Sequence, residues 1–186
     1  IFDPSKVDQP PAGLSIADVN RAREPLRPLE KLPTSRQRYA LAMSIAHRFR
    51  SSTIRASERI YFDSWGVKAS TTDARYMIDV TKPLRLWPHL RLHAQSGASF
   101  YKRAYPIAQT IDGAQDIIDT YRAGDRELGP LVAVTLGGGG RYAFGERQNW
   151  GVFLTGDGVY TRFQNHLFVT NRWGIFGALG LEVDLE

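Results

Sequence analysis

The sequence contains no cysteine among its 186 residues. This absence excludes a disulfide scaffold and cysteine-based zinc sites, and it leaves the cellular compartment open. Long hydrophobic runs are missing as well. No stretch of about 18 apolar residues is present, so no transmembrane helix is expected. The mean hydropathy of -0.32 would by itself indicate a soluble protein.

The charge balance is basic, with 24 lysines and arginines against 19 acidic residues and a formal net charge of +5. Arginine supplies 19 of these cations and lysine 5, and arginine is preferred for bidentate pairing with carboxylates and phosphates. Nucleic acid, lipid phosphate and a charged interior are all compatible with this surplus. Because basic and acidic residues are interleaved rather than separated into patches, we expect no nucleic-acid binding.

The first 34 residues differ from the rest of the chain. Six of the ten prolines fall there, no strand pattern is visible, and neither an initiator methionine nor a signal peptide opens the sequence. We expect residues 1–34 to form a proline-rich loop or arm. We expect residues 35–186 to form strands, with a long loop at 103–129, and the whole to be the C-terminal part of a larger protein.

The stretch RLWPHLRLHAQSGASFYKR, residues 85–103, alternates between two faces. Apolar residues such as Leu86, Leu90 and Ala94 occupy one face, and basic or polar residues such as Arg91 occupy the other. A period of two indicates a β-strand. Since ordinary strands have about 5–6 residues, the pattern predicts an unusually long one.

Six further segments alternate in the same way. The seven predicted strands cover 38–49, 53–66, 72–81, 85–103, 131–144, 150–164 and 175–186. The predicted connections between them are alternately short and longer. Both features are typical of transmembrane β-barrels, whose strands turn apolar side chains to the lipid and polar side chains to the lumen.

A strand needs about 9–11 residues to cross the hydrocarbon of a bilayer, and its backbone groups are all paired only in a closed barrel. We therefore predict an all-β fold, an antiparallel transmembrane β-barrel with at least seven long strands. Aromatic residues near the ends of the apolar faces fit the interfacial girdles of such barrels. They are Tyr39, Phe49, Phe100, Tyr142, Phe144, Trp150 and Tyr160. The alternative is a soluble antiparallel barrel or sandwich with one wet face.

The polar faces of the predicted strands carry both signs of charge, which can pair in a lumen. The predicted lumen-facing polar network consists of Arg55, Arg59, Asp63, Asp73, Arg75, Asp79, Arg85, His89, Arg91 and His93. His89 and His93 are four residues apart, about 13 Å along a strand, so they do not bind one metal ion together. We predict no metal site and no cofactor.

The remaining motifs do not indicate a catalytic or ligand-binding site. Four consecutive glycines, 137–140, lack the lysine and the helix of a phosphate-binding loop, and we expect them to let the sheet bend or another backbone approach. Asp112, Asp116 and Asp119 do not have the spacing of an EF-hand. No serine has the surroundings of a nucleophile elbow. We therefore expect no enzymatic activity.

Two runs resemble an uncharacterised family of Gram-negative outer-membrane β-barrel proteins, a domain of unknown function. The first places Tyr61, Asp63, Trp65, Gly66 and Thr71 in a strand–loop–strand pattern. The second places Gln95, Ser96, Ala98, Phe100 and Tyr101 at an aromatic strand end. The resemblance covers residues 36–186 and implies an outer-membrane location and a barrel fold, with no activity attached.

One feature departs from that family pattern. Outer-membrane barrels usually end on an aromatic residue, whereas this sequence ends on Leu185 and Glu186. With the C-terminal strand ending in the periplasm, the short turns are also periplasmic, and counting back seven strands puts residues 1–34 outside the cell. Since single-chain barrels have even strand numbers and both ends in the periplasm, either further strands precede residue 1 or residues 1–34 contain a strand. We favour the first.

The sequence thus favours an outer-membrane β-barrel with a structural or assembly role and a charged, ion-paired lumen. Its expected partners are the lipid bilayer, lipopolysaccharide and envelope proteins that contact the loops. A porin-like channel for small polar or anionic solutes is the first alternative, because about 16 strands leave a channel whereas about 8 do not. A soluble all-β binding module is the second.

Overall fold

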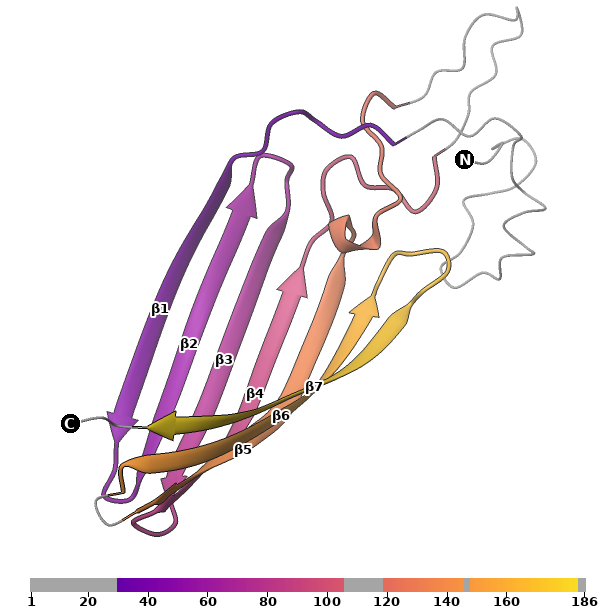
Figure 1. Ribbon diagram of the computed structural model, residues 1–186. Coiled ribbons are helices and arrows are strands. Elements are labelled where there is room, and N and C mark those ends of the chain that lie inside the picture. The colour runs from indigo at the N-terminus through magenta and orange to yellow at the C-terminus, as the bar shows by residue number, and fades with distance from the viewer. Residues whose placement is uncertain (1–29, 106–118, 146–147, 184–186) are drawn as a thin grey trace, which may run out of the picture.

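The computed structural model of the protein describes residues 30–105, 119–145 and 148–183. These residues form one antiparallel sheet in which seven strands follow one another in chain order (Figure 1). The strands are β1 (Arg38–Arg48), β2 (Ser52–Asp63), β3 (Lys68–Asp79), β4 (Leu84–Gln95), β5 (Leu131–Phe144), β6 (Trp150–Phe163) and β7 (Asn171–Val183). A single turn of 3-10 helix, η1 (Arg126–Leu128), precedes β5. The predicted all-β, antiparallel fold is confirmed.

The connections gather at two opposite ends of the sheet (Figure 1). Segments 49–51 and 80–83 and residues 145, 148 and 149 lie at the turn end, and segments 64–67, 96–105, 119–130 and 164–170 lie at the loop end. The predicted alternation of short and longer connections is only partly right, because the 64–67 loop is no longer than the 80–83 turn. That loop is tight because Gly66 adopts a left-handed φ of 85°, which glycine accepts without strain.

The strand predicted over 85–103 is the clearest error of the sequence reading. β4 ends at Gln95, and the chain then leaves the sheet even though the alternation of residue types continues. The backbone N–H of Ala98 donates to Leu128 O at 2.8 Å, and that of Ser99 donates to Trp65 O at 2.8 Å. Hydrogen bonds to these loop residues replace the ladder of the sheet. The alternation of apolar and polar residue types therefore continues past the end of the strand and does not mark where β4 ends.

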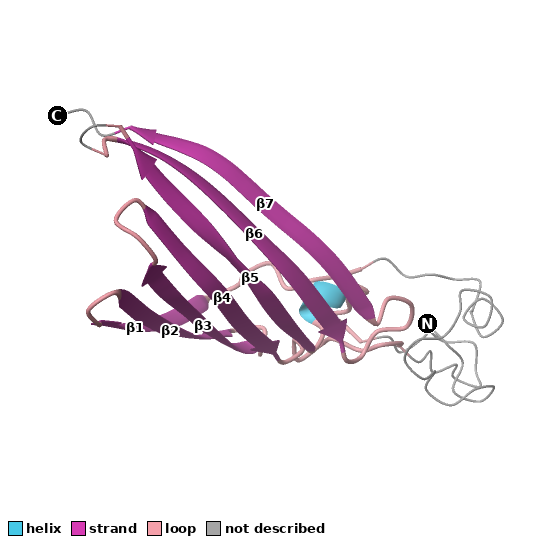
Figure 2. Ribbon diagram, turned by 90° about the horizontal axis from the view of Figure 1, so that it is seen from below, coloured by secondary structure: helices cyan, strands magenta, loops and turns pink. Residues whose placement is uncertain are grey.

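The sheet is strongly curved and twisted, and it is open (Figure 2). Each strand from β2 to β6 pairs with a neighbour on both sides, whereas β1 and β7 each pair with one strand among the described residues. The predicted closed barrel is therefore not present in the part of the chain that the structure describes. The ladder between β3 and β4 lapses near Pro88, which has no backbone N–H to donate.

The register of the ladders sorts the side chains into two faces. We call apolar face the side that carries Leu41, Ile60, Leu90, Leu136 and Leu179, which adjoining strands place in cross-strand rows. We call polar face the opposite side, which carries the charged residues of the alternating segments. Large side chains on the apolar face stand free, with 63% of the surface of Leu136 and 74% of that of Leu179 exposed. No second layer of structure covers this face within the described residues.

The cluster of buried apolar residues that pack together is small and lies at the loop end. It consists of Val67, Ala98, Ala123 and Leu128, with Tyr61, Trp65, Phe100 and Tyr101 packed against it. Phe100 meets the ring of Trp65 edge-on at 5.5 Å. The prediction that Phe100 ends an apolar strand face is therefore wrong, because this ring packs inside the cluster of loops.

Two predicted segments fall mostly or partly outside the described residues. Of the predicted arm at 1–34, only 30–34 are described, and Lys31 there forms an isolated bridge with Arg122. Of the loop at 103–129, the parts 103–105 and 119–129 are described. Asp112 and Asp116 lie outside the described residues. The described part of the chain contains no helix of the length and hydrophobicity needed to cross a bilayer.

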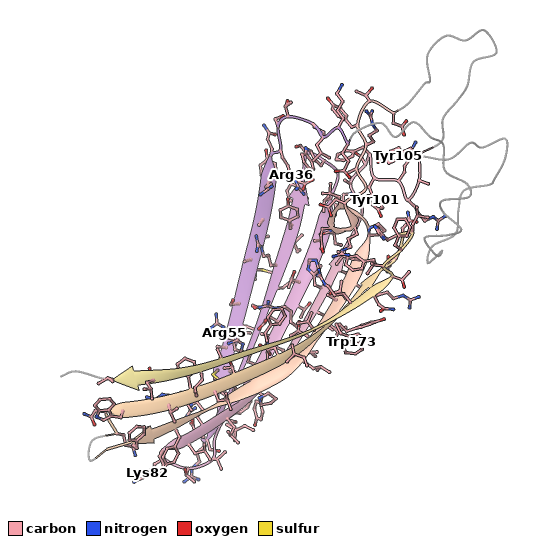
Figure 3. All side chains as sticks on the ribbon, turned by 45° about the vertical axis from the view of Figure 1, so that its right-hand side comes forward. Arg36, Arg55, Lys82, Tyr101, Tyr105 and Trp173 are labelled. Carbon is pink, nitrogen blue, oxygen red and sulfur yellow. The ribbon has the colours of Figure 1, made fainter. Side chains whose placement is uncertain are left out.

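Tyr101 joins three loop-end segments and gives a test of this core. Its hydroxyl donates to the backbone O of Asn165 at 2.6 Å, and its ring lies where a Cβ on Gly129 would come within 2.7 Å of it (Figure 3). Burial raises the pKa of Tyr101 to about 12. The native state therefore keeps this proton at a pH where the unfolded chain, with a tyrosine pKa of about 10, releases it.

We expect the free energy of unfolding to fall as the pH rises from about 10 to about 12, since the unfolded state loses the Tyr101 proton first. In Tyr101→Phe this part of the decline should disappear, and stability at neutral pH should drop by about 1 kcal/mol for the lost hydrogen bond. Urea unfolding at a series of pH values measures both effects. Tyr39→Phe, at an exposed position of β1, is the matched control. A Tyr101→Phe protein with an unchanged alkaline decline would contradict this account.

Candidate functional site

The polar face brings the predicted polar network together. All ten predicted residues lie on β2, β3 and β4, and the ladder register places them on the same side of the sheet. Figure 3 shows Arg55 within the sheet, between Arg36 at the loop end and Lys82 at the turn end. The acidic members hold three separate centres along this face, at Asp79, Asp73 and Asp63.

Asp79 is the centre nearest the turn end. Arg85 Nε donates to its Oδ1 at 2.7 Å, and Arg48 Nη2 donates to its Oδ2 at 2.5 Å. One carboxylate on β3 thereby ties β1 to β4, with β2 lying between β1 and β3. Since both arginines are about half exposed, solvent screening keeps the contribution of each pair to stability small.

Asp73 is the middle centre and has the most cationic surroundings. His89 Nε2 lies 2.9 Å from its Oδ2, and Arg91 Nε donates to the same oxygen at 2.8 Å. Arg75 Nε is farther away, 3.7 Å from Oδ1. His89 is buried, with 8% of its surface exposed, so the carboxylate and the ring are held in a partly dehydrated setting where hydrogen bonds are stronger than in water.

The other nitrogen of His89 faces a second carboxylate. His89 Nδ1 lies 2.9 Å from Oδ1 of Asp157 on β6, so this imidazole is clamped between Asp73 and Asp157. An ionised carboxylate only accepts hydrogen bonds, and only the imidazolium donates from both ring nitrogens. The geometry therefore fits a charged ring between two carboxylates. It does not fit a general base, because no nitrogen is left to accept a proton from a nucleophile.

Gly137 makes this clamp possible. It pairs with His89 on one side and with Asp157 on the other, so the hydrogen bond from β4 to β6 passes over β5 at this residue. A Cβ on Gly137 would collide with Oδ1 of Asp157 and with the backbone O of Gly156. Two residues along, the indole of Trp87 lies over Gly139 in the same way, 2.7 Å from where a Cβ would be. The alternate glycines on the polar face are thus gaps that neighbouring side chains fill.

Asp63 is the third centre, at the loop end. Its carboxylate accepts hydrogen bonds from Arg36 Nε at 2.8 Å, from Tyr61 Oη at 2.7 Å and from the backbone N–H groups of Trp65 and Val67 at 2.9 and 3.1 Å. This residue thereby closes the loop between β2 and β3. The guanidinium of Arg36 also lies 4.4 Å from the centre of the Trp65 ring, which is cation–π distance.

Three predicted members do not find the acidic partners expected of them. His93 shares a hydrogen bond of 2.8 Å with Thr71 Oγ1 through its Nδ1. Arg55 and Arg59 make no hydrogen bond and no ion pair with any described residue, and both are exposed. The sequence reading also missed Arg36, Arg48 and Asp157 as partners. Asp157 stood on the polar side of its alternating segment, but only the register of β4, β5 and β6 shows that it meets His89.

The described charged side chains of this face mostly form ion pairs and hydrogen bonds with one another. Among residues 30–105, 119–145 and 148–183, no group of three or more histidines and carboxylates is arranged to hold a metal ion. Among the described residues, Glu58 is an acidic residue that lies on the apolar face. It accepts hydrogen bonds there from Ser70 Oγ at 2.6 Å and from Thr72 Oγ1 at 2.5 Å, so its charge is shielded by hydroxyl groups.

The clamp on His89 can be tested through Gly137. We expect Gly137→Ala to lower the free energy of unfolding by about 1–3 kcal/mol, because the added methyl group overpacks the space that the Asp157 carboxylate occupies. Gly156→Ala, where a Cβ meets nothing within 4 Å, is the control and should change stability by no more than about 0.5 kcal/mol. The midpoints of urea unfolding under identical conditions measure the difference. Equal effects of the two substitutions would show that Gly137 is not needed for the clamp.

Comparison with known proteins gives a family and little more. A family model described as "Protein of unknown function (DUF3570)" matches residues 9–165. The match covers more than half of the chain, and it begins earlier and ends sooner than the resemblance at 36–186 indicated. No match to a curated protein or to a solved structure was found. The prediction of an uncharacterised family is confirmed, and the chain belongs to this family of proteins of unknown function (DUF3570).

Proposed function

We propose that the seven strands form part of the wall of an outer-membrane β-barrel, with the apolar face on the lipid and the polar face toward the lumen. The observation that carries the proposal is the uncovered apolar face, on which Leu41, Leu136 and Leu179 are 61%, 63% and 74% exposed. Soluble proteins rarely leave so large an apolar surface in water. The ion-paired polar face on the other side matches the alternation of barrel strands.

The height of the apolar face supports this orientation. On β7 it runs from Trp173 to Val183, a span of ten residues or about 33 Å along the strand. With a strand tilt of about 40°, this corresponds to about 25 Å across the membrane, which is the height of the apolar band of bacterial barrels.

Aromatic pairs border the apolar face at both ends. Tyr160 and Trp173 have ring centroids 4.7 Å apart near the loop end, and Phe144 and Trp150 have centroids 6.4 Å apart near the turn end. Figure 3 shows Trp173 projecting outward from the sheet. Amphipathic rings at these two levels fit the interfacial girdles of a membrane barrel.

Within this proposal the protein is a structural or assembly component. The three acidic centres tie strands together across the polar face, which favours a packed, ion-paired lumen. Closure requires further strands to pair with the free edges of β1 and β7, because unpaired backbone groups are not tolerated in lipid. The loop end faces the cell exterior, where lipopolysaccharide and other envelope proteins are its proposed partners.

A pair of cysteine substitutions on β5 tests the orientation, since the native chain contains no cysteine that would react. Leu136→Cys lies on the apolar face and Thr135→Cys on the polar face. With the protein in lipid vesicles, we expect Leu136→Cys to resist a water-soluble maleimide and to react in denaturant. A Leu136→Cys protein that stays soluble without detergent and labels rapidly would overturn the membrane proposal. It would favour a soluble all-β binding module.

A porin-like channel is the second candidate function, favoured by the exposed and unpaired Arg55 and Arg59. It predicts stable unitary currents when the full-length protein is inserted into a planar bilayer, and rapid labelling of Thr135→Cys from the water-filled lumen. Insertion without currents, together with a protected Thr135→Cys, would contradict the channel and favour a closed structural barrel.

A further inference from the structure

A group of arginines on the polar face carries more positive charge than the neighbouring carboxylates neutralise. Arg55 on β2 and Arg75 on β3 are directly opposite in the ladder. Like charges in such a position destabilise a sheet. Arg55 has no partner among the described residues. The nearest acid to Arg75 is Asp73, 3.7 Å away, and this carboxylate is already occupied by His89 and Arg91.

These arginines surround a hollow of about 670 Å³ on the polar face. Four arginines and two carboxylates line it, namely Arg55, Arg59, Arg75, Arg91, Glu58 and Asp73. The balance of four positive and two negative charges is +2. The side chain of Glu58 bonds to Ser70 and Thr72 on the apolar face, so the charge presented within the hollow itself is more positive still.

The strand beside these arginines leaves room for a ligand. Between Arg38 and Arg48, β1 presents only small side chains on the polar face: Ala42 faces Arg59, Ser44 faces Ser57 and Ala46 faces Arg55. The two serines therefore lie between the rows of Arg59 and Arg55. Their hydroxyl groups are donors that an oxyanion in the hollow can use, and no described residue fills the space in front of them.

We propose that this hollow is a binding site for a phosphate dianion, the phosphate group of a small phosphorylated solute, held by Arg55 and Arg75 and approached by Arg59. The guanidinium fork pairs with phosphate oxygens through two hydrogen bonds. A double negative charge offsets most of the surplus in the hollow, which is +2 with Glu58 counted and +3 without it. The ligand is a solute rather than a lipid, because the hollow opens on the face opposite the apolar face. The site goes beyond the structural role proposed above, and binding at it does not require that role.

Calorimetric titration of the full-length protein with inorganic phosphate, at constant ionic strength in chloride, tests the site. We expect saturable binding that weakens at least tenfold in Arg55→Gln and in Arg75→Gln. Arg75→Lys should lose most of the same affinity, because it keeps the charge and loses the fork. The control is Arg141→Gln, which removes one positive charge from the same face where Arg141 pairs with Glu182 at 2.6 Å. It should leave phosphate affinity unchanged.

The outcomes separate this site from the membrane proposal. Absence of saturable phosphate binding, or equal weakening by Arg141→Gln, would overturn the site. Binding of succinate as tight as that of phosphate would overturn the phosphate assignment. Thermal melting checks the fold of each variant, and Arg59→Gln replaces any that fails to fold. Saturable, arginine-dependent binding by a protein that needs no detergent would keep the site and remove the membrane proposal.

Discussion

The register of β4 between β3 and β5 is the constraint on which the rest of the polar face depends. Together with the neighbouring ladders it places Arg55, Arg75, His89, Gly137 and Asp157 in one row that crosses five strands. A shift of one residue would turn every charged side chain of β4 to the apolar face, where no carboxylate of Asp73 or Asp79 is available. The clamp around His89 and the bonds to Asp79 both hold this register.

Small residues decide which charges on this face meet and which stay apart. Gly137 allows His89 to reach over one strand to Asp157, and the same lack of a side chain at Gly139 admits the ring of Trp87. On β1 the small residues Ala42 and Ala46 have the opposite effect. No side chain there bonds to the guanidinium of Arg59 or Arg55, so a space remains beside two cations that have no ion-pair partner among the described residues. One half of the face is thus filled by its own side chains, and the other half is open.

Periodicity identified the strands and their faces because the alternation of side chains follows directly from the pleat. All ten predicted polar residues share one face for this reason. The hydrogen-bond and ion-pair partners of these residues were less predictable, because they depend on strand register and on residues distant in the chain. Arg36 reaches Asp63, and Arg48 reaches Asp79, across 27 and 31 residues. The end of β4 was missed since Ala98 and Ser99 find backbone partners in loops, which residue type does not reveal.

The closed and the conducting forms of the proposed barrel differ in what neutralises Arg55 and Arg75. In a packed lumen two neighbouring cations need an opposite charge beside them, because burying an unpaired charge costs free energy. Within the described residues Arg55 has no such charge and Arg75 has only Asp73, 3.7 Å away, while Asp73 and Asp79 each have at least two closer cationic partners. The carboxylates are therefore saturated and the arginines are not. An anion from solution neutralises these arginines in a closed barrel and in a conducting one. The proposed site therefore indicates the charge of the ligand but not the width of the lumen.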